Sequence, residues 1–275
     1  MKTPSRNSFV TTIGLAATAS LLTLFLFASP VTRGADPNNQ ATKQHYEIRT
    51  YLLGEDGDAA AVDHYLQHAL IPALNRIEIG PVGVFAPAAN DTNDRDSIIV
   101  VIPADSADQL ASLQTRLQND AQYLADAKPY LERGPQDAPY ARISSEMLVA
   151  MDCMPKLNVP AGTLDNDDRV YELRLYESAN ERLGNLKVDM FNNGEVPIFL
   201  DSGIAPVFIG QAVVGPQTPN LTYLTVYPND DARLKAWDAF RAHPDWQVLK
   251  NVAKYKGTVS KIDKHVLVAK PYSQM

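Results

Sequence analysis

Two short segments of the chain carry the same charged and aromatic residues at the same spacing. Each places a glutamate, an arginine and a tyrosine at alternate positions: Glu47, Arg49 and Tyr51 in YEIRTY, and Glu172, Arg174 and Tyr176 in YELRLY. Alternate residues of a β-strand point to the same face, so each trio would present its side chains together. An arginine in that setting could hold a carboxylate or another anion. The two trios are therefore candidate ligand-binding groups.

The residues between the members of each trio are mostly apolar, and we expect them to pack on helices. The trios should then face a gap between two sheets, where an unpaired charge costs several kcal/mol. One interpretation is a polar lumen that binds a small ligand. The other is that Glu47 pairs with Arg49 and Glu172 with Arg174 across the interface to fix its register, because structural ion pairs resemble binding sites.

A pair of histidines has a spacing that can serve a metal ion. His64 and His68 lie four residues apart on a predicted helix, which can turn two imidazoles to one side. The apolar face of that helix lies opposite both of them, so we expect them to point to solvent. The corresponding positions in the second half of the chain hold Asp189 and Asn193. We therefore predict no metal site.

The remaining histidines offer weaker candidates. In His243-Pro244-Asp245-Trp246, an imidazole and the Trp246 indole could stand at the mouth of a cavity. Alternatively, Pro244 begins a new helix and Trp246 is a packing anchor. His45 and His265 lie at strand ends, where we expect exposure. Haem would need an axial ligand, usually histidine, and we expect none in the lumen.

Composition and missing motifs exclude several functions. The net charge of −7 disfavours binding to nucleic acid, because phosphate backbones need a positive field. Cys153 is the single cysteine, so neither an internal disulfide nor a CxxC motif can form. The sequence has no nucleophile elbow, phosphate-binding loop, dinucleotide-binding loop or zinc-protease motif. We predict no catalytic residue and no cofactor.

The two trios belong to a long internal repeat. Tyr46 and Tyr171 begin the two segments, which gives an offset of 125 residues by subtraction. Three proline pairs keep that offset, namely Pro72 with Pro197, Pro81 with Pro206, and Pro103 with Pro228. Separate anchors in one register indicate a duplication. The first copy carries about six extra residues in Lys128–Pro139, a stretch that its composition predicts to be a loop.

Each copy predicts the order βαββαβ. Alternating or apolar runs predict the strands, at 46–53, 80–88, 97–103 and 143–151 in the first copy and 170–177, 204–214, 221–228 and 259–270 in the second. Pro72 and Pro197 should kink or break the helices that contain them. A βαββαβ unit is ferredoxin-like, with both helices on one face of its sheet. We therefore predict an α+β fold in which two tandem units pack sheet to sheet as an intramolecular barrel.

The N-terminal residues resemble a targeting segment. Lys2 and Arg6 precede a long apolar run, and no acidic residue appears before Asp36. The run is close to the length that spans a membrane, so residues 1–35 are either a cleaved signal peptide or an uncleaved anchor. Residues 36–44 are polar and predict a linker. We expect an exported protein, periplasmic or secreted, that meets a membrane only if this segment is retained.

The strand motif, the proline-bearing first helix and the segment HPDWQ together resemble the NIPSNAP family. That family is similar to the dimeric α+β barrel superfamily, so the resemblance implies two NIPSNAP-like units, at 45–152 and 169–275, joined by a linker at 153–168. The first copy has Asn119-Asp120-Ala121-Gln122 where the second has Trp246 and its neighbours. Any site that uses this tryptophan should therefore be asymmetric.

Three functions follow from these observations. The first is an exported module that binds a small molecule or a partner, supported by the missing catalytic motifs. The second is a cofactor-independent oxygenase- or isomerase-like enzyme of the α+β barrel type. The third is a structural scaffold, which ion pairs between the units would stabilise. Association into a homo-oligomer is compatible with all three.

Overall fold

The computed structural model describes residues 42–91 and 96–275. Residues Ala41–Met275 form one compact unit. The predicted signal or anchor at 1–35 and most of the predicted linker at 36–44 lie outside the described residues. Among the helices of the described ranges, none combines the length and the apolar character needed to cross a membrane.

The first half of this unit contains four strands and a series of short helices. In chain order they are β1 (His45–Leu52), α1 (Ala59–Tyr65), the π-helical turn η1 (Leu66–Leu70), α2 (Ile71–Arg76), β2 (Gly83–Pro87), β3 (Ser97–Ala104), α3 (Ala107–Ala111), α4 (Leu113–Gln118), α5 (Ala121–Leu131) and β4 (Arg142–Ala150).

The second half has a similar order. It comprises β5 (Val170–Glu177), α6 (Glu181–Met190), the π-helical turn η2 (Phe191–Glu195), α7 (Val196–Asp201), β6 (Ala205–Val214), β7 (Asn220–Tyr227), α8 (Asp230–Ala242), α9 (Pro244–Leu249), the 3-10 turn η3 (Ala253–Tyr255) and β8 (Lys261–Ala269).

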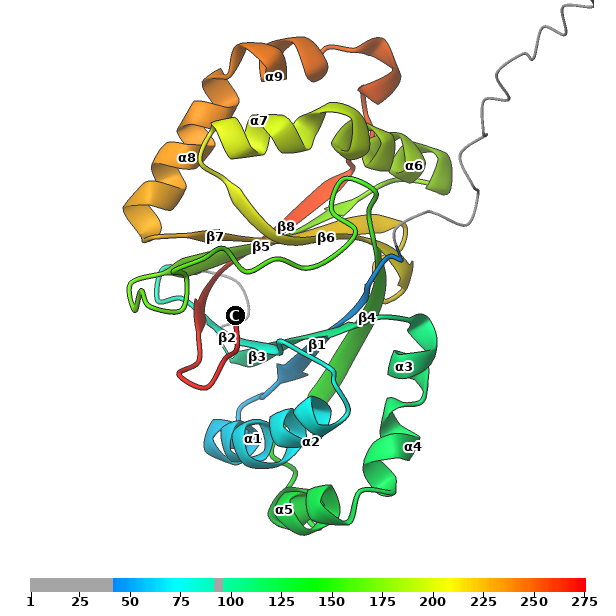
Figure 1. The fold of residues 1–275 in the computed structure, drawn as a ribbon, viewed down its shortest axis with the longest axis vertical. Coiled ribbons are helices and arrows are strands. Elements are labelled where there is room, and N and C mark those ends of the chain that lie inside the picture. Colours follow the sequence, from blue (N-terminus) through cyan, green and yellow to red (C-terminus); the bar gives the residue numbers. More distant parts are fainter. Residues whose placement is uncertain (1–41, 92–95) are drawn as a thin grey trace, which may run out of the picture. The chain divides into compact units, whose positions relative to one another are not determined.

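The eight strands close into one antiparallel barrel. Their order around it is β1-β3-β2-β8-β5-β7-β6-β4. The strands of each half lie side by side, and the halves join through β2 with β8 and through β4 with β6. Helices α1–α5 cover the strands of the first half and α6–α9 those of the second, on opposite sides of the barrel (Figure 1). The predicted α+β barrel is therefore present, as a mixed fold around a closed sheet.

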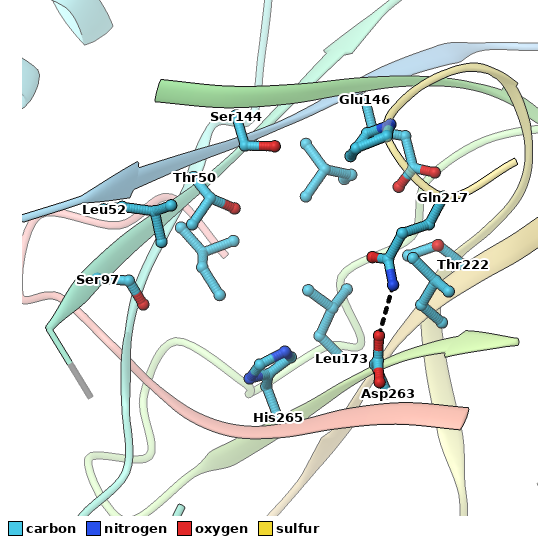
Figure 2. Close-up of a pocket in the computed structure, with 14 residues that line it drawn as sticks. Thr50, Leu52, Ser97, Ser144, Glu146, Leu173, Gln217, Thr222, Asp263 and His265 are labelled. Carbon is cyan, nitrogen blue, oxygen red and sulfur yellow. Dashed lines mark hydrogen bonds between the residues drawn. The ribbon is translucent and has the colours of Figure 1, made fainter. Parts of the chain in front are cut away.

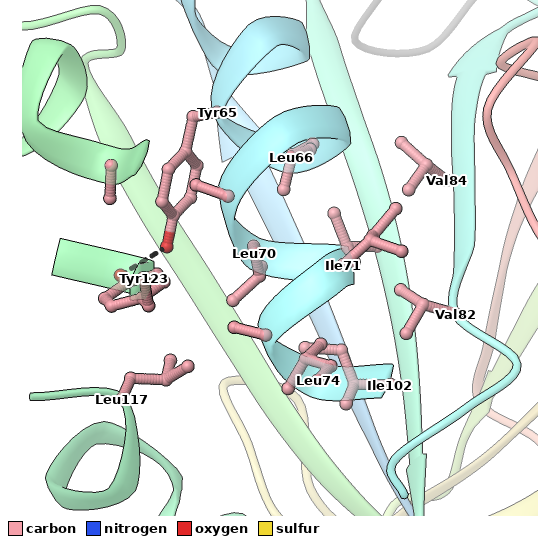
Figure 3. Packing of buried hydrophobic residues seen from close by; sticks show 14 of the residues in the cluster. Tyr65, Leu66, Leu70, Ile71, Leu74, Val82, Val84, Ile102, Leu117 and Tyr123 are labelled. Carbon is pink, nitrogen blue, oxygen red and sulfur yellow. Dashed lines mark hydrogen bonds between the residues drawn. The ribbon is translucent and has the colours of Figure 1, made fainter. Parts of the chain in front are cut away.

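Three apolar cores follow from this arrangement. One fills the barrel interior, and one lies under each helical layer. Strand β3 serves two of them, because Ile98 and Val100 face the helices whereas Ile99 and Val101 face the interior. A strand that is buried on both faces needs an unbroken apolar run, as SIIVVIPA provides. Figure 3 shows the first helical layer packed on the sheet.

The first helix of each half does not break at its proline. Instead, a π-helical turn precedes it, and Pro72 and Pro197 fall in the first turn of α2 and α7. Proline lacks an N–H and its ring crowds the carbonyl four residues earlier. Widening the helix by one residue at that point accommodates both effects. The turns Leu66–Leu70 and Phe191–Glu195 keep the 125-residue offset of the sequence repeat.

The prediction that Lys128–Pro139 is a loop is wrong for the first part of this segment. Helix α5 continues through Pro129 to Leu131. The ring of Tyr130 stacks on that of Tyr65, with 3.8 Å between centroids and 6° between planes. This contact anchors the last turn of α5 to α1, so the helix persists although proline disfavours a helix interior.

Candidate ligand-binding site

The two Glu/Arg/Tyr trios do not face the lumen as predicted. Tyr51 and Tyr176 belong to the cores under the two helical layers, whereas Ile48 and Leu173 belong to the barrel interior. The faces are therefore the reverse of those predicted. The inner faces of the closed sheet pack mainly against one another, so the charged residues lie on the outer face, where Glu172 accepts donors from α8 and Glu47 accepts one from Ser145 of β4.

In the second half, Glu172 is fully buried and accepts three hydrogen bonds. They come from Nη1 of Arg174 at 3.0 Å, Nη1 of Arg233 at 2.7 Å and Nε1 of Trp237 at 3.0 Å. Arg233 and Trp237 lie on α8, so this carboxylate ties that helix to β5. The Cζ atom of Arg174 also lies 4.1 Å from the Trp237 ring centroid. Such a charge, held by three donors, stabilises the helix–sheet contact.

The first half has a simpler version of the same contact. Arg49 donates from Nε and Nη2 to the two oxygens of Glu47, at 2.8 and 3.0 Å. Ser145 of β4 donates to the same carboxylate at 2.7 Å. The expected Glu–Arg pairs thus form, but each pair lies within one strand. They do not join the two halves across an interface.

Trp246 is also outside the lumen. Its ring lies 4.5 Å from that of Phe240, in the core under the second helical layer. His243 caps α9, because its Nδ1 accepts the backbone N–H of Asp245 at 3.2 Å. Pro244 follows as the first residue of the helix. The structure thus supports the packing interpretation of this segment.

One end of the barrel interior holds a cavity of about 220 Å3. Its lining comes from both halves: Ile48, Thr50, Leu52, Ser97, Ile99, Ser144, Glu146, Leu173, Leu175, Pro216, Gln217, Thr222, Asp263 and His265 (Figure 2). The rest of the interior is filled by large side chains such as Tyr46, Phe85 and Phe208. The lumen is therefore open only where polar residues replace them.

Glu146 is the most deeply buried acid of this cavity, with 8% of its surface exposed. Nδ2 of Asn220 donates to its Oε1 at 2.5 Å, and Thr222 in turn donates to Asn220 at 3.1 Å. Burial raises the pKa of Glu146, and the hydrogen bonds from Asn220 and Thr222 offset only part of that effect. This carboxyl is therefore suited to hold a proton.

Asp263 has the opposite character. Its burial opposes ionisation, but hydrogen bonds from Gln217 and Lys261 outweigh it and lower the pKa of Asp263. Nε2 of Gln217 donates to Oδ2 at 2.8 Å, and Nζ of Lys261 lies 2.9 Å from the same atom. One cavity thus contains an acid that favours its protonated form and another that favours its ionised form, an arrangement that can separate acid and base roles.

His265 completes the polar side of the cavity. Its Nδ1 lies 3.7 Å from Oδ2 of Asp91, an oxygen that accepts the backbone N–H of Val266 at 2.7 Å. The prediction that His265 and His45 are exposed is wrong, since both are half-buried. The expectation that no histidine faces the lumen is wrong for the same reason. His265 lies in the middle of β8, not at its end, and it lines the cavity.

Haem does not fit this lumen although His265 faces it. Pockets for drug-sized ligands have volumes of about 300–1,000 Å3, and the cavity here is smaller, about 220 Å3. His64 and His68 are exposed as predicted, with their rings 4.6 Å apart. Within residues 42–91 and 96–275, no group of three or more His, Cys, Asp and Glu could hold a metal ion.

The sequence contained a signal for the residues that we missed. Asp263 and His265 alternate in the last strand, and Glu146 is the one acid of ISSEMLVAM. Polar residues at alternate positions of a strand share one face, so they mark a polar site if that face points into the barrel. The sequence did not show which strands would meet, so these three residues were not grouped.

The raised pKa of Glu146 predicts a stability effect that depends on pH. The folded protein holds this proton more tightly than the unfolded chain, whose pKa is near 4.5. Ionising Glu146 thus costs stability as the pH rises above that value. Glu146→Gln should raise the free energy of unfolding at about pH 8 and not at about pH 4. Urea denaturation at both pH values measures this.

The control for that experiment is Glu55→Gln, which changes an exposed glutamate between β1 and α1. It should leave the free energy of unfolding unchanged at both pH values. Equal destabilisation by Glu146→Gln at both values would contradict the prediction.

The barrel and its internal cavity define a protein of the α/β-barrel class. Residues 171–274 match the NIPSNAP family model, so this part of the chain is a NIPSNAP domain. The predicted resemblance is thereby confirmed for the second half. No curated protein sequence matched the chain.

Solved structures share the fold at low identity. A candidate monooxygenase from Lactobacillus acidophilus NCFM is 12% identical with a TM-score of 0.52, over 82% of this chain and 94% of that one. Another from Fusobacterium nucleatum is 11% identical with a TM-score of 0.54, over 83% and 93%. An uncharacterized NIPSNAP-like domain protein from Burkholderia xenovorans is 15% identical with a TM-score of 0.36, over 39% and 90%. The first two similarities indicate a common barrel fold.

Proposed function

We propose that the chain is an exported protein that binds a small amphiphilic molecule in its barrel lumen. The observation that carries the proposal is the cavity itself, where Glu146, Asp263 and His265 converge on one space beside apolar walls. Binding sites usually combine apolar walls with a few polar groups that fix orientation. The charge order and apolar run of residues 1–35 support export.

The proposal includes an origin by duplication, with NIPSNAP-like units at 45–152 and 169–275 and a linker at 153–168. The strand orders β4-β1-β3-β2 and β8-β5-β7-β6 support it, since each places the fourth strand of a half beside the first. The offset shared by the π-helical turns supports it as well. In that case the ligand lies between the units, because both contribute to the cavity.

Filling the cavity should abolish binding. Ser144→Phe places a ring in the lumen, whereas Ile143→Phe on the same strand places one outside, where Ile143 is 38% exposed. We expect fragments from a mixed library to shift the NMR signals of lumen residues in the native protein and in Ile143→Phe, but not in Ser144→Phe. Lumen binding would be contradicted if Ser144→Phe abolished the signal shifts of no fragment in the library.

An enzyme is the second candidate, and the contrast between Glu146 and Asp263 favours it. An ionised Asp263 could take a proton from a ligand C–H while a protonated Glu146 gives one to a ligand oxygen, as in an isomerisation. Oxygenase-like chemistry that begins with the same proton removal is compatible with this site. The fragment experiment in heavy water tests both, because exchange of a carbon-bound proton by the native protein, lost in Glu146→Gln, would indicate catalysis.

A further inference from the structure

Among the residues that the structure describes, the titratable groups in the cavity lining are two acids, Glu146 and Asp263, and one histidine, His265. Of the two acids, Asp263 is the one that favours its ionised form. No lysine or arginine is among the described residues that line the cavity. The cation paired with Asp263 is Lys261, whose side chain is 58% exposed. The lumen therefore offers a carboxylate at Asp263, which attracts cations and repels anions.

Asp263 has room for another hydrogen bond. Both donors that reach it within the described part of the chain, Gln217 and Lys261, end on Oδ2. Its Oδ1 can therefore accept a bond from a ligand. A bond between an ammonium group and a carboxylate is stronger than one between neutral partners. The lowered pKa of Asp263 agrees with this role, because it keeps the acceptor ionised.

The polar groups of the cavity are interleaved with apolar ones. Ile48, Leu52 and Ile99 come from the first half, and Leu173 and Leu175 from the second. Leu173 and Leu175 lie directly opposite His265 and Asp263 on the neighbouring strand. A ligand that fits this lining has an apolar body and a cationic head. An anion of the same size would face the Asp263 carboxylate and, among the described lining residues, no lysine or arginine. An alcohol would bring a hydrogen-bond donor without a positive charge.

We propose that the lumen selects a small organic ammonium ion with an apolar body, held by Asp263. This inference rests on the proposed function, since it names the class of ligand for the same cavity. It extends that function from a site for amphiphilic molecules to a site that discriminates by charge.

Three compounds that differ mainly in charge provide the test: benzylamine, benzyl alcohol and benzoate. Calorimetric titration of the native protein near neutral pH should show the tightest binding for benzylamine and the weakest for benzoate. Asp263→Asn should reduce affinity for benzylamine at least about tenfold and should affect benzyl alcohol less. Asp201→Asn removes an equal charge from an exposed position on α7 and should leave all three affinities unchanged.

Several results would overturn this inference. They are binding of benzoate or benzyl alcohol as tight as that of benzylamine, unchanged benzylamine affinity in Asp263→Asn, or no binding of any of the three. If benzoate or benzyl alcohol binds and Ser144→Phe blocks it, the selection of cations is wrong but lumen binding is supported. If none of the three binds, the inference fails and the fragment library decides the proposed function separately.

Discussion

Glu195→Leu should lower the free energy of unfolding by about 3–5 kcal/mol, because it leaves the buried ammonium of Lys187 without its partner. Nζ of Lys187 and Oε2 of Glu195 are 2.6 Å apart, and their side chains are 5% and 1% exposed. The same ammonium lies 4.8 Å from the ring centroid of Phe191. Water cannot replace the lost carboxylate at this depth, so the charge stays uncompensated.

The first half of the chain shows how this position can be built without charge. At the 125-residue offset, Lys187 and Glu195 correspond to Val62 and Leu70, which are both fully buried. Replacing a buried ion pair with apolar residues of similar volume is often neutral or stabilising. Lys187→Val combined with Glu195→Leu should therefore recover most of the stability that Glu195→Leu loses.

Denaturation in urea measures the native protein, both single variants and the double variant. Together they form a double-mutant cycle, which isolates the coupling between the two side chains. If the double variant is as unstable as Glu195→Leu, the native ion pair stabilises the fold more than the apolar pair created by Lys187→Val and Glu195→Leu would. The cycle would then contradict our prediction.

Glu172→Gln should have an effect of similar size, about 3–5 kcal/mol. The substitution keeps the shape of the side chain but removes the charge that Arg174 and Arg233 share. Glu172 has no exposed surface, so Arg174 would lose its ion-pair partner at a largely buried position, and Arg233 would keep only its pair with Asp230. The corresponding Glu47→Gln should cost less, about 1–3 kcal/mol, because Glu47 pairs with one arginine and is 13% exposed, whereas Glu172 pairs with two arginines and is fully buried.

Indole fluorescence separates a local effect from a global one. Trp237 donates its N–H to Glu172, whereas Trp246 packs on Phe240. We expect Glu172→Gln to change the emission of the folded protein and to lower the midpoint of thermal unfolding. Glu47→Gln, in the other helical layer, should leave the emission unchanged. Equal losses of stability in the two variants would show that burial does not decide the strength of these pairs.

The sequence was sufficient to predict the barrel and its strands, because the two halves of the chain show the same order of strand and helix patterns. It was not sufficient to predict which face of β1 and β5 points inward. A period of two residues separates two faces but does not say which is the lumen. Both faces of these strands are covered, one by helices and one by the opposite sheet, so Ile48 and Tyr51 are both buried.

The cavity could not be assembled from sequence for a related reason. Glu146 lies on β4, which pairs with β6 of the other half. His265 lies on β8, which pairs with β2 of the other half. These neighbours are far apart in the chain, and no local pattern specifies them. Thr222 lies on β7 and Gln217 between β6 and β7, both in the second half, so the cavity forms only when the two halves close into one barrel.

The two junctions between the halves are shorter than every pairing within them except that of β2 with β3, which also spans three residues. β2 and β8 pair over three residues and β4 and β6 over four, whereas β1 and β3 pair over eight. Partial unfolding should therefore begin along these junctions, since local opening follows the regions with the fewest contacts. A half released in this way would expose two unpaired strand edges, which can pair with the same edges in another molecule. Domain-swapped dimers are the expected product of such opening at high protein concentration.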